Sequence, residues 1–137
     1  MQVSSLCACF LVTALWQQAL TDTISVRCFL FLSENTGLPH GNFNLVTIMY
    51  GFHEVPKEGR SRIIQEAKRL LKVGGTLAIV DISPSYTPSK YMLAGEPFVI
   101  EYQQNIDKQL ASVPGFKFSR RKEIVPGHVN LWLLTAK

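Results

Sequence analysis

The stretch FNLVTIMYGFHEVP, residues Phe43–Pro56, decides how this sequence is interpreted. Its first seven residues are apolar almost throughout, which is typical of a parallel strand that helices cover on both faces. Pro56 then marks the start of a helix. His53 and Glu54 are therefore predicted at the point where a buried strand reaches the surface.

A helix and a second strand follow this stretch. Apolar residues recur at spacings of three and four, which predicts a helix with one apolar stripe made of Ile63, Ile64, Ala67, Leu70 and Leu71. Gly74 is predicted as the left-handed cap that ends the helix. The segment TLAIV at 76–80 is predicted as a buried strand that ends at Asp81. Strand, helix and strand form a βαβ unit, whose crossover should be right-handed.

The flanking segments extend this pattern in both directions. Residues 5–20 are predicted as a helix and residues 26–32 as a strand buried on both faces. A helical turn near 91–93 and a longer helix opened by Pro97 are expected after Asp81. Residues 116–125 and 129–136 are predicted as strands joined by a turn. The chain should thus be an α/β protein that closes in an antiparallel hairpin.

Composition limits the classes of function. The chain has 137 residues, 47% of them hydrophobic and 18% charged, which suits one globular domain. A net charge of +4 without a long basic stripe argues against nucleic-acid binding. Three cysteines without a C-x-x-C pair predict no metal site. The apolar run 6–16 is too short to span a bilayer and lacks a preceding basic residue, so a cytoplasmic protein is favoured over the alternative of a secretory or organelle-targeting leader.

Three ordered segments carry a resemblance to a known family. They are SENTGLPHGNFNLV (33–46), RLLKVGG (69–75) and TLAIVD (76–81). Together they resemble class I S-adenosylmethionine-dependent methyltransferases of type 11, particularly those grouped with the ubiquinone and menaquinone biosynthesis enzymes. Asn44 and Val73 replace the family's usual Asp and Pro. The resemblance covers 29–137 and implies a partial Rossmann-like sheet, mostly parallel, with a C-terminal antiparallel hairpin.

The first strands of that family, with their glycine-rich turn, have no counterpart here. Gly37 is the first glycine of the chain. Residues 1–28 are therefore interpreted as a divergent, helical leader, and residues 29–137 as the C-terminal part of a methyltransferase domain. Without a neighbouring first strand, Phe43–Met49 should present an unpaired edge through which the chain could self-associate.

The resemblance implies S-adenosylmethionine as cofactor and a small-molecule methyl acceptor, whose identity the sequence does not give. The candidate cofactor-binding residues are Ser33, Glu34, Met49, Tyr50 and Gly51. His53 is the candidate proton acceptor, because its ordinary pKa lies near neutrality. An apolar substrate pocket is expected from Tyr86, Tyr91, Met92 and Phe98, although core packing would explain them equally well. The competing hypothesis is a catalytically inactive fragment that acts through association with another protein.

Overall fold

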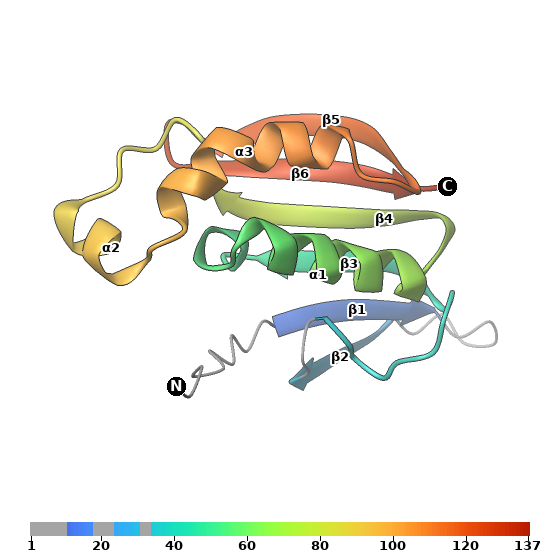
Figure 1. Cartoon of the computed structure of the whole chain (residues 1–137). Coiled ribbons are helices and arrows are strands. Elements are labelled where there is room, and N and C mark those ends of the chain that lie inside the picture. Colours follow the sequence, from blue (N-terminus) through green and yellow to red (C-terminus); the bar gives the residue numbers. More distant parts are fainter. Residues whose placement is uncertain (1–10, 18–23, 31–33) are drawn as a thin grey trace.

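The computed structural model describes residues 11–17, 24–30 and 34–137, and its strands form one six-stranded sheet (Figure 1). The order across the sheet is β2-β1-β3-β4-β6-β5. The strands are β1 (Leu11–Gln17), β2 (Ile24–Leu30), β3 (Phe43–Met49), β4 (Leu71–Ile82), β5 (Phe116–Val125) and β6 (Val129–Ala136). No described helix is long and apolar enough to cross a membrane.

The predicted βαβ unit is confirmed. Strands β3 and β4 are parallel, with Val46 opposite Leu77 and Ile48 opposite Ile79, and helix α1 (Lys57–Leu70) connects them. The role of Gly74 was predicted wrongly. The helix ends at Leu70, and Gly74 instead lies in a four-residue excursion of β4, between the residues that pair with Phe43 and Leu45. Gly74 has a left-handed backbone, with φ of +80°, which glycine adopts without strain because it has no Cβ.

The α/β class and the closing hairpin are also confirmed. Strands β5 and β6 are antiparallel, and β6 also runs antiparallel to β4. The pair β3–β4 is the parallel part of the described sheet, because the other four strand pairs are antiparallel. The parallel part is therefore smaller than the sequence suggested.

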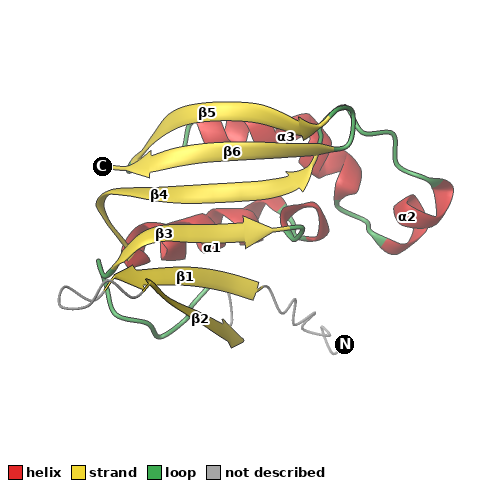
Figure 2. Cartoon of the chain, turned by 180° about the vertical axis from the view of Figure 1, so that it is seen from behind, coloured by secondary structure: helices red, strands yellow, loops and turns green. Residues whose placement is uncertain are grey.

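Both long helices, α1 and α3 (Val99–Ala111), lie on one face of the sheet, as the two opposite views show (Figures 1 and 2). The short helix α2 (Lys90–Gly95) lies beyond the end of the sheet. Alternate side chains of the strands point toward the helices, and they include Leu77, Ile79, Trp132 and Leu134, all fully buried. These residues and the apolar stripe of α1 form the hydrophobic core.

The opposite face of the sheet carries no helix among the described residues (Figure 2). The side chains that alternate with the core positions are only partly buried, and they are Leu45, Thr47, Ala78, Val80, Leu131 and Leu133. We call this set the open face. Doubly wound sheets normally bear helices on both faces, so the described part of this chain forms two layers where such folds have three.

The N-terminal strands correct two predictions. Residues Leu11–Gln17 form strand β1, so the helix predicted over 5–20 is wrong there, and the rest of that range lies outside the described residues. Strand β1 pairs with β3 through Thr13–Thr47, Ala14–Val46 and Leu15–Leu45. The predicted free edge of β3 is therefore occupied. The physical reason is that the backbone groups along that edge need partners, which a strand supplies and a helix does not.

The segment 26–32, predicted as a strand buried on both faces, corresponds to β2, which is the outermost strand of the described sheet. Residues Ile24–Leu30 pair with β1 on one side, and no other described strand lies on the second side. The last two residues of the predicted range 26–32 lie outside the described residues.

A buried carboxylate ties the loop before β3 to helix α1. Glu66 accepts hydrogen bonds from the backbone N–H of Thr36 (2.9 Å) and its hydroxyl (2.6 Å). Arg69 donates two more, each 2.7 Å long. The Arg69 hydrogen bonds, helped by those of Thr36 and opposed by burial, lower the pKa of Glu66 to about 2. This cluster holds the loop against the helix that follows β3.

Candidate active site

The carboxyl ends of β3 and β4 meet at one edge of the sheet, which is where open α/β sheets bind ligands. Asp81 lies at the end of β4 and is fully buried. Its carboxylate accepts hydrogen bonds from the N–H groups of Phe52 (2.7 Å), His53 (3.3 Å) and Ile82 (2.7 Å). Asp81 thus fixes the 3₁₀ turn η1 (Phe52–Glu54) that follows β3.

The same carboxylate orients the ring of His53. Nδ1 of His53 lies 2.5 Å from Oδ1 of Asp81, and a carboxylate acceptor requires the proton to be on Nδ1. Nε2 consequently points toward Glu96, at 3.4 Å, and Glu54, at 3.8 Å. Burial lowers the pKa of His53, but the Asp81 hydrogen bond and the charges of Asp81, Glu96 and Glu54 outweigh it and raise the pKa above 6.5.

His53, Glu54 and Glu96 form a compact polar cluster. One ligand atom from each lies within 4.8 Å of the others, and Oε2 of Glu96 is buried without a hydrogen bond. Such donor types suit a divalent cation. Ion pairing between a protonated His53 and the two carboxylates accounts for the cluster equally well, so no metal role is assigned to it.

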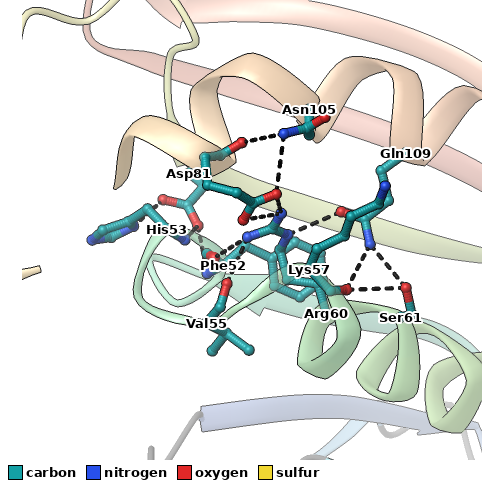
Figure 3. A network of polar contacts seen from close by, with 10 residues as sticks. Phe52, His53, Val55, Lys57, Arg60, Ser61, Asp81, Asn105 and Gln109 are labelled. Atoms are coloured by element: carbon teal, nitrogen blue, oxygen red, sulfur yellow. Dashed lines mark hydrogen bonds and ion pairs between the residues drawn. The ribbon is translucent and has the colours of Figure 1, made fainter. Parts of the chain in front are cut away.

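Arg60 supports the turn that carries His53 (Figure 3). Its side chain is fully buried and donates to both carboxylate oxygens of Glu101, at 2.9 and 2.8 Å. It also donates to the carbonyl of Val55 (2.5 Å) and to Gln109 (2.9 Å), and it lies 5.6 Å from the centre of the Tyr102 ring. Arg60 therefore joins α1, α3 and the end of η1.

Sequence reasoning missed Arg60 and Asp81 as positioning residues. A signal for Arg60 was present, because it precedes Ile63, Ile64 and Ala67 by the spacings that define the apolar stripe of the helix. For Asp81 the sequence marked only the end of a strand. Its partner, His53, is 28 residues away along the chain, and only the parallel pairing of β3 and β4 brings the two together.

The predicted cofactor residues fall into two groups. Met49 and Tyr50 are half-exposed at the carboxyl end of β3, and Tyr50 adopts a left-handed φ of 51°, which is uncommon for a residue with a side chain. Gly51 follows and is buried. Glu34 instead forms a two-point ion pair with Arg62, at 2.7 and 3.1 Å, on the exposed surface of α1. Ser33 lies outside the described residues.

The predicted pocket residues lie around α2 and the chain on either side of it. Tyr91 is 91% exposed on α2, and Met92 is next to it. Tyr86 packs against the ring of His128, with centroids 5.6 Å apart, and Phe98 caps the start of α3. None of the four lines the 460 Å³ cavity between α1 and α3. Their role in binding an acceptor stays a prediction.

Comparison with known proteins decides the family. Residues 6–79, more than half of the chain, match the family model described as "Methyltransferase domain". The chain belongs to this methyltransferase domain family. The match begins within the first 28 residues, which the sequence suggested were a divergent leader. No curated protein sequence matches the chain significantly.

Solved structures of methyltransferases share the fold. A SAM-dependent methyltransferase from Aquifex aeolicus is 17% identical, with a TM-score of 0.61, over 81% of this chain and 55% of that one. A SAM-dependent methyltransferase from Methanosarcina mazei is 12% identical, with a TM-score of 0.58, over 88% and 72%. The mitomycin 7-O-methyltransferase is 16% identical, with a TM-score of 0.57, over 77% and 32%. The chain thus spans about a third of the mitomycin 7-O-methyltransferase and about half of the Aquifex aeolicus enzyme.

Proposed function

We propose that this chain carries the acceptor side of an S-adenosylmethionine-dependent methyltransferase site that acts on a small molecule. The observation that supports this proposal is the His53–Asp81 pair at the carboxyl ends of two parallel strands. Ligands of open α/β sheets bind at such ends. The exposed side chains of Met49 and Tyr50 lie at the end of the same strand.

His53 has the arrangement of a general base. An acceptor hydroxyl or amine loses a proton when it is methylated. Nε2 of His53 can take that proton when the imidazole is in its neutral form. Asp81 holds the other nitrogen as a hydrogen-bond donor and stabilises the imidazolium that forms. The raised pKa means that the base becomes available only as the pH rises through that pKa.

The residues that the structure describes do not fit the whole cofactor. In this family a glycine-rich turn after the first strand holds the amino-acid end of S-adenosylmethionine. Strand β1 here runs antiparallel to β3. The carboxyl end of β1 therefore lies at the opposite end of the strands from the carboxyl ends of β3 and β4. Glu34, the candidate for the adenine end, is already paired with Arg62.

Calorimetric titration with S-adenosylmethionine tests the cofactor side. We expect a dissociation constant weaker than about 1 mM, corresponding to a binding free energy of no more than roughly 4 kcal/mol. Micromolar binding would show that the chain holds the cofactor with residues other than Glu34, Met49, Tyr50 and Gly51.

The acceptor side is tested by replacing His53. In assays of S-adenosylhomocysteine formation at several millimolar cofactor, with a panel of phenols and amines, His53→Gln should lower turnover and leave cofactor affinity unchanged. His40→Gln, in the exposed loop before β3, is the matched control. Equal turnover of the His53 variant and the parent protein would remove the general-base role.

The second candidate function is a catalytically inactive protein that acts through association, and the open face favours it. Its apolar side chains are only partly buried, and large apolar patches often mark interaction sites. Self-association through the edge of β3 is no longer available, because β1 occupies it. Sedimentation velocity between 5 and about 200 μM distinguishes the candidates. A monomer at every concentration that turns over an acceptor would exclude the inactive alternative.

A further inference from the structure

A cavity of about 460 Å³ lies between helices α1 and α3, on the helical face of the sheet. The two helices lie side by side in both views (Figures 1 and 2). The cavity is lined by residues of these helices and of the segment that follows α3, none of which belongs to the His53 cluster. Its volume is within the range of small-molecule sites, which is about 300 to 1,000 Å³.

The lining combines an apolar floor with basic side chains. Ile64 is 2% exposed, and Val113 packs against the hydrophobic core. Lys57, Lys68 and Lys108 also line the cavity, and none of the described residues that line it is acidic. Lys57 and Lys68 are eleven residues apart on α1, so roughly 16 Å of helix separates them along its axis. The cavity is therefore elongated and electropositive.

Within residues 34–137, no acidic side chain forms an ion pair with the lysines of the cavity. Asp107, which precedes Lys108, is bound to Arg121 (2.6 Å) and to the indole N–H of Trp132 (2.8 Å). Glu101 is bound to Arg60. Lys68 already has a partner, because its ammonium group donates to the backbone oxygen of Lys137 at 2.7 Å.

Two of the lysines are available to a ligand. Within residues 34–137, neither ammonium group of Lys57 and Lys108 has a hydrogen-bond or ion-pair partner. The amide of Gln109 fixes the backbone beside Lys57 by donating to its carbonyl at 3.0 Å. Helix α1, which carries Lys57, and helix α3, which carries Lys108, are thus joined by this hydrogen bond, which uses neither ammonium group.

We propose that this cavity binds an amphipathic organic anion. The apolar body would lie on Ile64 and Val113, and the carboxylate or phosphate would pair with Lys57 and Lys108. Charge-assisted hydrogen bonds from lysine to a carboxylate or phosphate are stronger than neutral ones. The exposed ammonium groups of Lys57 and Lys108 would hold the anionic group at the mouth of the cavity, while the apolar body reaches the buried Ile64. The site is separate from the proposed methyl-transfer edge, so it does not depend on the chain's catalytic activity.

Binding is measured by calorimetry, with octanoate and octyl phosphate as probes. Octan-1-ol is the control that lacks the charge, and acetate is the control that lacks the apolar body. Both anionic probes should bind at least tenfold more tightly than octan-1-ol and acetate. The double variant Lys57→Gln, Lys108→Gln should lose at least tenfold in affinity. A difference between octanoate and octyl phosphate identifies which anionic group the site prefers.

The control is the double variant Lys90→Gln, Lys117→Gln, which removes the same charge from exposed positions outside the cavity. Its affinity should equal that of the parent chain. Amide shifts in ¹⁵N–¹H spectra should be confined to residues near 57–68 and 105–114. Shifts on β4 and β6 instead, equal binding of octan-1-ol, or unchanged affinity of the cavity double variant would each overturn the proposal. Failure to bind S-adenosylmethionine would leave it intact.

Discussion

Glu66→Gln tests how the loop before β3 is held to α1. Glu66 is 7% exposed and accepts hydrogen bonds from Thr36 and Arg69. Lowering its pKa from 4.5 to about 2 corresponds to about 3 kcal/mol of folding free energy at pH 7. Arg69 is 36% exposed, and solvent screening reduces this value, so we expect the variant to lose about 2 kcal/mol.

The pH dependence separates the charge from simple packing. Because the pKa is lowered on folding, the stabilisation is complete above the unfolded pKa of 4.5 and is lost as the pH falls toward about 2. Urea unfolding should therefore show the difference between parent and variant shrinking by more than about half between pH 7 and pH 3. Glu58→Gln, on the exposed first turn of the same helix, is the control and should change little. A pH-independent difference would refute the electrostatic explanation.

Three further predictions concern the turn around His53 and the excursion in β4. Arg60→Met should destabilise the chain by about 3 kcal/mol in urea unfolding, because it removes a fully buried charge, the donor to the Val55 carbonyl and both of the Arg60 hydrogen bonds to Glu101. Gly74→Ala should cost about 1 kcal/mol, because alanine is strained at φ of +80°. Asp81→Asn should lower the pKa of His53, measured by NMR titration of the ring, since the Asp81 hydrogen bond and charge raise it. The stability that the raised pKa provides is present below the unfolded pKa and is lost as the pH rises through the folded one.

Each of these has a matched control. Arg62→Met removes an exposed ion pair on the same helix and should leave stability unchanged. Gly95→Ala, at a glycine without positive φ and with no atom near its would-be Cβ, should not destabilise the chain. The His40 ring, in an exposed loop, serves as the internal reference in the titration of the Asp81 variant. An unchanged His53 titration would mean that Asp81 only positions the turn.

The central part of the fold could be predicted because its signals are local. The apolar run of β3, the stripe of α1 and the turn residues between β5 and β6 each lie within a few residues of one another, and each was placed correctly. Strand β1 could not be predicted in this way. An apolar segment of about ten residues suits a buried helix or a strand equally. Here the strand forms because it pairs with the backbone along one side of β3, more than twenty residues away in the chain.

For the site, the sequence by itself determined which residues lie at the ends of the strands, including His53 and Tyr50, because strand ends are marked by the change from apolar to polar residues. Only the tertiary structure decided what these residues contact. The parallel register of β3 and β4 brings Asp81 to His53, and the packing of α3 on the sheet brings Glu101 and Gln109 to Arg60. The physical reason is that hydrogen bonds and ion pairs act over a few ångströms of space. The residues that form them here are 28 to 49 positions apart in the chain, a separation across which sequence periodicity carries no information.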